Sequence, residues 1–275
     1  MSGTTDGAGR ERAAAVDGLL RDKVVVVSGV GPGLGRALAV RSALAGADVV
    51  LAARTGPVLA EVAGAVEKAG RRALAVPTDI TDDASAAALV EAATGTFGHV
   101  DVLVNNAFAV PPMTDLVDVD LDAVRAGFET NVYAALRLTR LLAPALAESS
   151  GAVVMINSVV LRHSKPLFGA YKMAKAGLLA LAQSLATELG PRGVRVNTVT
   201  PNYIWADAFK GYVDYLAGER GVPARDVYDE FAASLDLRRL PEPEEIADAA
   251  VFLASDLASA ITGQCLDVNG GEYHH

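Results

Sequence analysis

A tyrosine and a lysine four positions apart could together move a proton. Tyr171 and Lys175 stand in the stretch Tyr-Lys-Met-Ala-Lys, at the start of an alanine-rich apolar run. On a helix this spacing places both side chains on one face. A neighbouring ammonium favours a phenolate, so we expect Lys175 to draw the pKa of Tyr171 from ~10 towards neutrality. The alternative is an ordinary helix whose tyrosine faces the core while its lysine reaches water.

A glycine-rich turn near the start of the chain could hold a phosphate. A β-branched run at 23–27 leads to Gly29, Gly33 and Gly35, and a helix-like segment covers 34–45. A strand, a glycine turn and a helix in this order bring backbone N–H groups to a pyrophosphate. The context predicts dinucleotide binding, with a purely structural turn as the alternative.

The end of the second expected strand, 48–53, bears on the choice of cofactor. It closes with Arg54 and Thr55 and has no acidic residue. A carboxylate there would bind the adenosine 2′-hydroxyl of NAD, whereas Arg54 could bind the 2′-phosphate of NADP through a forked contact. We expect NADP(H) and keep NAD(H) as the alternative. Asp79, after the third strand, could accept from the adenine amino group or cap the helix that starts near Thr81.

Strands and helices alternate along most of the chain. Further strands are expected at 72–77, 101–105, 152–157, 195–200 and 265–268. Helices are expected at 57–69 and 122–146. Three more are expected: one that starts near Thr81, one that contains Tyr171 and Lys175 and ends near Leu189, and one that follows Pro241 and ends near Ala254. This order predicts an α/β protein: a single-domain Rossmann fold, a doubly wound parallel sheet of about seven strands with helices on both faces. Ligands bind at the carboxyl ends of such strands. Asn131, inside the expected helix 122–146, lowers helix propensity and therefore suggests a functional role.

At 275 residues the chain suits one large domain. We expect a mobile tail at 1–20, a Rossmann domain at 21–271 and a second tail at 272–275. The segment 207–237 is rich in aromatic residues and helical in spacing, and it interrupts the alternation. We interpret it as a lid over the substrate; an extra packing hairpin or an oligomer contact is the alternative.

Charge and cysteine content narrow the class of partner. The formal net charge of -9 argues against nucleic acid and anionic membranes as partners, and there is no apolar run of about 18 residues that could span a bilayer. The single cysteine, Cys265, excludes an intrachain disulfide and is expected to be a small buried residue in a strand. A cytoplasmic location follows as an expectation. The terminal pair His274 and His275 predicts no metal site.

Over about residues 22–271 the sequence resembles the short-chain dehydrogenase/reductase family, in its 3-oxoacyl-reductase-like branch. Ser28-Gly29-xxx-Gly33-x-Gly35 is similar to the family's TGxxxGxG turn, and Asn105-Asn106-Ala107 resembles the start of its NNAG segment. Asn131, Ser158, Tyr171 and Lys175 match its catalytic tetrad, at separations of 27, 13 and 4. Four residue types at three spacings are more specific than any one motif.

The resemblance implies an NAD(P)-dependent enzyme that interconverts a secondary alcohol and a ketone by hydride transfer. Ser158 would bind the substrate oxygen, Tyr171 would exchange its proton, Lys175 would assist Tyr171 and hold the nicotinamide ribose, and Asn131 would position a water. The implied cofactor contacts are Gly29, Gly33, Leu34, Gly35, Arg54, Thr55, Asp79, Ile80, Asn106, Ala107, Tyr171, Lys175, Pro201 and Ile204. We also expect a homo-oligomer, either a dimer or a tetramer.

The chain departs from the family pattern at several positions. Phe108 replaces the glycine of NNAG, and Asn202 replaces the glycine that follows Pro201. Ala206 stands where many members have a threonine that touches the nicotinamide amide, which puts that contact in doubt. Pro32 stands where NADP-preferring relatives often have a basic residue, which leaves Arg54 as the one signal for NADP.

The substrate is expected to be an apolar or alicyclic alcohol or ketone. The candidate contacts are mostly apolar, as in ordinary ligand pockets: Phe108, Val160, Phe168, Tyr203 and Trp205. Trp205 could instead anchor a subunit interface. The rival function is a catalytically inactive dinucleotide-binding regulatory or structural subunit. Such a protein would be expected to have lost Tyr171 or Lys175, and both are present.

Overall fold

The computed structural model describes residues 16–110 and 112–274. Seven strands form one sheet in the order β3-β2-β1-β4-β5-β6-β7, and each neighbouring pair is parallel. The strands are β1 (Val24–Ser28), β2 (Asp48–Ala53), β3 (Ala73–Pro77), β4 (Val102–Asn105), β5 (Ala152–Ile156), β6 (Arg195–Pro201) and β7 (Cys265–Val268). β1, β4 and β5 are buried at every position because helices cover both faces of the sheet. The predicted doubly wound α/β fold is confirmed.

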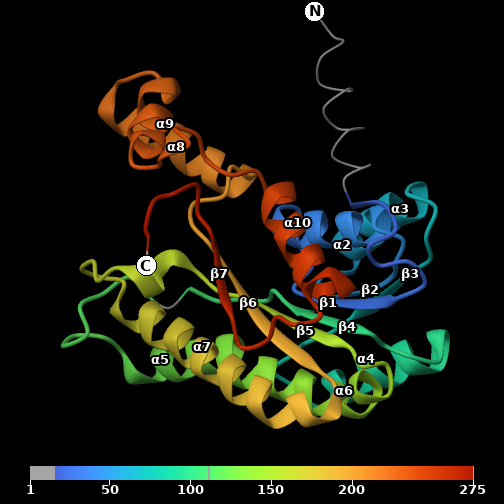
Figure 1. The fold of residues 1–275 in the computed structure, drawn as a ribbon. Helices are drawn as coiled ribbons and strands as arrows, with labels where there is room; N and C mark the ends of the chain where they lie inside the picture. The colour runs from blue at the N-terminus through green and yellow to red at the C-terminus, as the bar shows by residue number, and fades with distance from the viewer. Residues whose placement is uncertain (1–15, 111, 275) are drawn as a thin grey trace, which may run out of the picture.

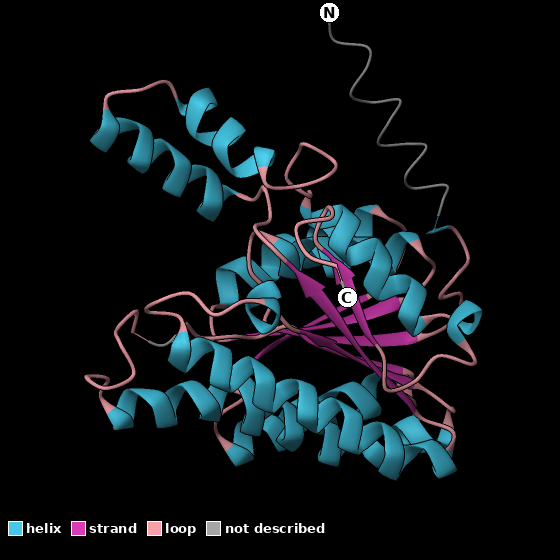
Figure 2. Ribbon diagram, turned by 60° about the vertical axis from the view of Figure 1, so that its left-hand side comes forward, coloured by secondary structure: helices cyan, strands magenta, loops and turns pink. Residues whose placement is uncertain are grey.

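Two layers of helices cover the sheet (Figures 1 and 2). The helices are α2 (Leu34–Leu44), α3 (Gly56–Lys68), α4 (Asp83–Phe97), α5 (Leu121–Phe128), α6 (Ala134–Glu148), α7 (Gly169–Leu189), α8 (Asp207–Arg220), α9 (Ala224–Ala233) and α10 (Pro243–Ala254), with short 3-10 turns at Val159–Arg162, Gly190–Arg192 and Asp256–Ala258. One apolar core joins α2, α3 and α10 to the sheet, and another joins α4, α6 and α7 to its opposite face.

The strand order reverses between β1 and β4, and this reversal creates the ligand-binding edge. Ser28 and Asn105, the last residues of these strands, are register partners. Just beyond them, the Asn106 backbone N–H donates to Ser28 O at 3.0 Å and its side-chain amide donates to Gly29 O at 2.7 Å. Asn106 therefore fastens the start of the glycine turn to the end of β4.

The single helix expected at 122–146 is wrong, because a π-helix at Glu129–Tyr133 separates α5 from α6. Asn131 lies in this π-helix and is buried. Its side-chain amide donates to Ala109 O at 2.7 Å and to Gly127 O at 2.8 Å. An asparagine that lowers α-helix propensity is thus used where the helix widens and where a neighbouring loop must be held.

The described residues near both ends of the chain contact the rest of the fold. Val16 and Leu20 belong to the buried core, so the described part of the segment 1–20 is anchored, while 1–15 lie outside the described residues. At the other end, Tyr273 O accepts a hydrogen bond from Asn269 at 3.0 Å. Cys265 is half-buried, not buried as expected, because β7 is an edge strand of the sheet. Its Sγ lies 3.3 Å from Arg162 and 3.1 Å from Thr200.

The segment predicted as a lid forms the hairpin of α8 and α9. Val213, Ala217 and Val227 form a small core of its own, with Trp205 and Phe209 packed against it. Figures 1 and 2 show this hairpin projecting from the body of the molecule. The first residues of α8 nevertheless reach the cleft described below.

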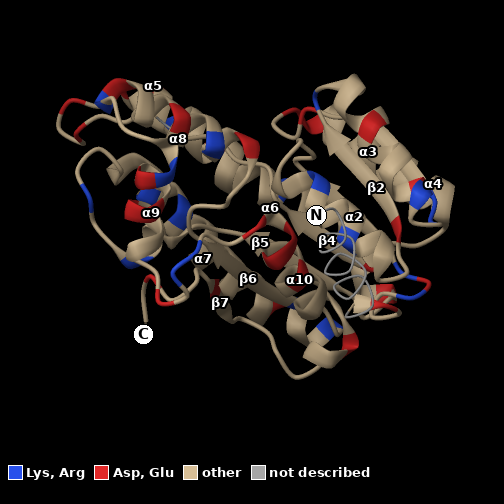
Figure 3. Ribbon diagram, turned by 90° about the horizontal axis from the view of Figure 1, so that it is seen from above, with Lys and Arg blue, Asp and Glu red and all other residues tan. Residues whose placement is uncertain are grey.

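Charged side chains are distributed over the helices and loops (Figure 3). None of the helices within 16–110 and 112–274 is long and apolar enough to cross a membrane. The same residues contain no group of three or more His, Cys, Asp or Glu side chains that could hold a metal ion.

Candidate active site

Tyr171 and Lys175 lie near the start of α7, on its buried side. Lys175 is 2% exposed, and its Nζ donates to Ile156 O, at the end of β5, at 3.0 Å. The ammonium lies 5.8 Å from the centre of the Tyr171 ring and 5.9 Å from the centre of the Phe108 ring. Both distances are within the range of cation–π attraction. The Lys175 Nζ therefore lies near both rings at the carboxyl end of the sheet.

Burial shifts the pKa values of both groups. It lowers the pKa of Lys175 to about 7, and it raises the pKa of Tyr171 to about 12 against the opposing effect of a hydrogen bond with Ser158. The expectation that Lys175 draws the Tyr171 pKa towards neutrality is thus not met. The physical reason is that removal from water disfavours the charged form of each group, the phenolate as well as the ammonium.

Asn157 positions this pair, although it is absent from the residues predicted above. Its side-chain amide donates to Lys175 O at 3.0 Å, and its Oδ1 accepts from the Ser158 N–H at 2.9 Å. The bond to Lys175 O fastens the end of β5 to α7, and the bond from the Ser158 N–H fixes the backbone at Ser158. The available signal was a polar residue directly after the apolar strand Ala152–Ile156.

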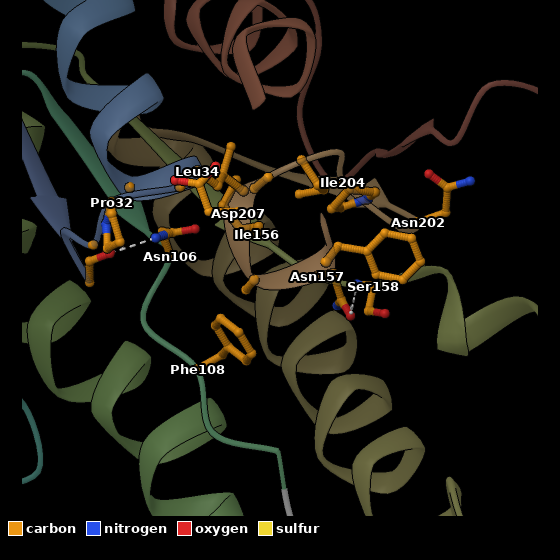
Figure 4. A pocket seen from close by; sticks show the side chains of 18 of the residues that line it. Pro32, Leu34, Asn106, Phe108, Ile156, Asn157, Ser158, Asn202, Ile204 and Asp207 are labelled. Atoms are coloured by element: carbon orange, nitrogen blue, oxygen red, sulfur yellow. Dashed lines mark hydrogen bonds between the residues drawn. The ribbon is translucent and has the colours of Figure 1, made fainter. Parts of the chain in front are cut away.

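A cleft runs along the carboxyl ends of the strands as two adjoining cavities of about 390 and 400 Å³. Both are lined by Gly29, Gly31, Asn106 and Phe108. The first also contains Ser158, Tyr171 and Lys175. Figure 4 shows Pro32, Leu34 and Asn106 on one side of it, Asn157 and Ser158 on the other, and the Phe108 ring pointing between them.

Every residue predicted to contact the cofactor lines this cleft. The first cavity is lined by Gly29, Gly33, Leu34, Gly35, Asn106, Tyr171, Lys175, Pro201 and Ile204, and the second by Arg54, Thr55, Asp79, Ile80 and Ala107. Of the four predicted catalytic residues, Asn131 does not line either cavity. It lies behind the second one, where its neighbour Thr130 forms part of the wall.

The glycine turn fits a dinucleotide. A Cβ on Gly29 would lie 2.4 Å from Ala107 N, and one on Gly35 would lie 2.4 Å from Gly29 O, so the turn packs against its surroundings as only glycine allows. A Cβ on Gly31 would meet nothing within 4 Å, which leaves bare backbone facing the cleft before α2. Such a backbone at a helix N-terminus suits a pyrophosphate.

Asp79 lies at the far end of the cleft and does not cap the following helix. Its Oδ1 accepts from the Thr81 N–H at 2.9 Å and from the Thr81 hydroxyl at 2.7 Å. These bonds lower the pKa of the Asp79 carboxyl. Asp82 is the cap of α4, accepting from the Ser85 N–H at 2.7 Å. The capping role expected for Asp79 is therefore wrong.

Of the five predicted substrate contacts, only Phe108 lines the cleft. Val160 is buried, and Phe168 packs edge-on against His163. Tyr203 stacks on Phe209 at 4.8 Å and Trp205 meets the Tyr228 ring at 4.7 Å, so both belong to the base of the hairpin. The cleft-lining residues absent from the predicted set are Gly31, Pro32, Ile156, Asn157, Asn202, Ala206, Asp207, Ala208 and Phe209 in the first cavity.

A glycine turn at the switch point of a parallel sheet, leading to a serine, a tyrosine and a lysine, defines a class of nicotinamide-dependent oxidoreductases. The family model described as enoyl-(acyl carrier protein) reductase matches residues 29–273, and the chain belongs to the short-chain dehydrogenase/reductase family.

Particular relatives are similar over nearly the whole chain. An uncharacterised oxidoreductase of Mycobacterium tuberculosis is 40% identical over 258 residues, which are 92% of each protein. Cis-4-hydroxycyclohexanecarboxylate dehydrogenase of Sinomonas cyclohexanicum is 39% identical over 91% of this chain and 96% of its own. The structure of 7α-hydroxysteroid dehydrogenase with NADH and 7-oxo glycochenodeoxycholic acid has a TM-score of 0.83 at 32% identity, covering 93% of this chain and 96% of that one. The protein is an NAD(P)-dependent dehydrogenase that acts on CH–OH groups.

Proposed function

We propose that the protein interconverts a secondary alcohol and a ketone on an apolar or alicyclic substrate. The observation that carries this proposal is the set of apolar side chains that line the same cavity as Ser158 and Tyr171, among them Phe108, Ile204 and Phe209. Apolar side chains suit a saturated ring better than a polyhydroxylated one. Two similar proteins are named for ring substrates, a hydroxycyclohexane and a hydroxysteroid, which supports the choice.

The nicotinamide, when bound, supplies or accepts the hydride. Ser158 binds the substrate oxygen, and Tyr171, neutral at pH 7 because burial raises its pKa to about 12, donates a proton to that oxygen during ketone reduction. In alcohol oxidation the phenol of Tyr171 must first pass its own proton through Lys175 to solvent, and the phenolate then accepts the proton of the alcohol. Lys175 steadies the developing phenolate and binds the nicotinamide ribose, while Asn131 positions a water that leads to solvent.

Gly29, Gly31 and Gly35 would hold the pyrophosphate of the cofactor. Arg54, Thr55, Asp79 and Ile80, at the other end of the cleft, would hold its adenosine. The closing sequence of β2 has no carboxylate to select a free 2′-hydroxyl, so we propose that NADP(H) is preferred and NAD(H) accepted. The segment 207–237 is proposed to cover the bound substrate, because Asp207, Ala208 and Phe209 already line the cleft.

The test records nicotinamide absorbance while the purified protein meets both cofactors and a panel of alcohols. The panel contains 4-substituted cyclohexanols, a hydroxysteroid, a linear secondary alcohol and an aldose. We expect turnover of the alicyclic alcohols, and a loss of about a thousandfold in Tyr171→Phe, since the group that accepts the proton of the alcohol is removed.

The matched control is Tyr215→Phe, which changes a tyrosine 61% exposed on α8. It should retain full activity. A clear preference for the aldose would overturn the substrate class, and undiminished turnover by Tyr171→Phe would overturn the mechanism.

A further inference from the structure

Arg137, in the first turn of α6, joins three segments of the chain. Its Nε bonds to Asp83 at the start of α4, its Nη1 donates to Ile80 O at 3.1 Å, and its Nη2 donates to Glu129 Oε1 at 3.0 Å. The side chain is only 20% exposed. A guanidinium presents its donors in a fixed plane, so one arginine can serve all three acceptors together.

Two of these segments form the wall of the cofactor cleft. Ile80 lines the cavity at the Arg54 end, and Thr130, next to Glu129, lines the same cavity. Arg137 itself is not among the lining residues of either cavity. It therefore lies behind the wall and can affect a ligand only through the backbone that it holds.

The spacing of Glu129 and Arg137 depends on the π-helix. In a regular α-helix, residues eight apart are turned by about 80° from each other, whereas residues seven apart differ by about 20°. The π-helix at Glu129–Tyr133 contributes one extra residue to the turn, so Glu129 faces Arg137 at a separation of eight. A continuous α-helix would turn Glu129 away, so this ion pair favours the π-helix over the regular form.

We propose that Arg137 is a positioning residue that holds the adenosine end of the cofactor cleft and the π-helix of Asn131 in one arrangement. Through Ile80 and Asp83 it sets the loop between β3 and α4. Through Glu129 it holds the widened turn that presents Asn131. The proposal rests on the proposed function, which gives Ile80 and Asn131 their roles.

A plain surface ion pair would behave differently. Asp83 is 86% exposed, and exposed ion pairs add little to stability. If Arg137 served stability alone, its loss would lower the melting temperature and leave cofactor affinity and pH dependence unchanged. The two acidic partners lie on different segments, so their roles can be separated by mutation.

The test compares Arg137→Met, Arg137→Lys, Asp83→Asn and Glu129→Gln with the control Arg140→Met, which lies one turn further along α6 and is exposed. Three quantities are measured: the dissociation constants of NADPH and NADH by calorimetry without substrate, the amide hydrogen exchange of residues 127–133, and the pH profile of kcat/KM for alcohol oxidation. Melting temperatures show that each variant is folded.

Asp83→Asn should weaken cofactor binding about threefold to tenfold and leave exchange at 127–133 unchanged. Glu129→Gln should speed that exchange about tenfold and shift the pH profile, and it should weaken cofactor binding less than Asp83→Asn does, because only Thr130 of this segment lines the cavity. Arg137→Met should show both effects, and Arg137→Lys should resemble it because an ammonium cannot span three acceptors. Arg140→Met should show neither.

Arg137→Met with wild-type affinity, exchange and pH profile would overturn the proposal. So would identical changes in Asp83→Asn and Glu129→Gln, since the two contacts would then have no separate roles. If the wild-type protein binds neither dinucleotide, the proposed function fails instead, and the exchange of residues 127–133 still decides whether Arg137 holds the π-helix.

Discussion

At the scale of single residues, burial determines the charge states of Tyr171 and Lys175. The Lys175 pKa of about 7 and the Tyr171 pKa of about 12 both reflect the loss of water around a group whose charged form needs it. Near pH 7 the tyrosine is a neutral acid, and Lys175 can gain or lose its proton at little cost. A lysine near its own pKa is suited to passing a proton between a phenol and solvent.

Lys175 makes the stability of the protein depend on pH. Its pKa is about 7 in the folded chain and 10.5 as a free side chain, so between these values the unfolded chain binds a proton that the folded chain does not. Wild-type stability should therefore rise with pH across this window, because the linked contribution is present above 10.5 and lost as pH falls through 7. Lys175→Met should remove this slope. The stability that it gains over wild type should be larger at pH 6 than at pH 10 by on the order of 4 kcal/mol.

Urea denaturation at the two pH values measures this difference. Lys68→Met, which changes an exposed lysine on α3, provides the control and should keep the wild-type slope. If the unfolding free energy of Lys175→Met changed with pH as that of wild type does, folding would not lower the pKa of Lys175.

Arg54 should decide the choice between cofactors. Arg54→Asp should weaken NADPH binding about a hundredfold while changing NADH binding by less than about threefold, since only NADPH carries the 2′-phosphate that the guanidinium would pair with. Arg54→Lys keeps the positive charge but loses the forked pair of donors, so its NADPH affinity should lie between those of wild type and Arg54→Asp. Calorimetric titration of each variant with both dinucleotides is the measurement, and equal affinities throughout would make Arg54 a surface residue only.

At the scale of elements, the glycine turn combines two requirements that single substitutions can separate. Gly29 has a φ of +89° and would place a Cβ 2.4 Å from Ala107 N, whereas a Cβ on Gly31 would meet open space. Gly29→Ala should therefore destabilise the fold by roughly 2 kcal/mol or more. Gly31→Ala should melt like wild type yet lose dinucleotide affinity, because the methyl group would occupy the place of the pyrophosphate.

Thermal melting and calorimetry on the same two proteins test this distinction. If Gly31→Ala bound the dinucleotide as tightly as wild type, the pyrophosphate would not lie against Gly31. An unchanged melting temperature in Gly29→Ala would mean that the loop of Ala107 moves freely.

The elements differ in how far the sequence predicts them. The buried strands and the glycine turn were predictable, because local patterns of valine, glycine and helix formers carry that information. The cleft followed from topology, since carboxyl ends of parallel strands meet at one edge. The π-helix was not predictable from the sequence. Asn131 indicates that the regular helix is disfavoured at this position, but the widened turn depends on tertiary contacts, of Asn131 with Ala109 and of Glu129 with Arg137.

The substrate contacts were the least predictable part of the site. Tyr203 and Trp205 follow the cleft-lining Pro201 closely, but their side chains pack among the rings of α8 and α9. In a loop there is no fixed period from which to infer which residues face the ligand, so composition alone favoured the large aromatics. Ile204, between them in sequence, faces the cleft instead.

At the scale of the whole molecule, we propose that copies of the chain associate as a dimer or tetramer. Several large apolar side chains remain exposed on α5, the π-helix and α7, among them Leu121 at 63%, Tyr133 at 51% and Met173 at 46%. Burying them against a second copy would remove apolar area from water. Sedimentation should give a mass of two or four chains, and Tyr133→Glu with Met173→Glu should lower it. A wild-type monomer at micromolar concentration would contradict this prediction.

The hairpin of α8 and α9 has a consequence for how such a protein can change over time. It carries its own small core, and it contributes only its first residues to the cleft. Mutations along its outer length therefore leave the sheet, the glycine turn and the tyrosine–lysine pair undisturbed. If the hairpin covers the substrate as proposed, we expect substitutions at its exposed positions to change the alcohol accepted while the sheet stays intact. A laboratory library confined to the exposed positions of 207–237, which leaves the small core of Val213, Ala217 and Val227 unchanged, would test this.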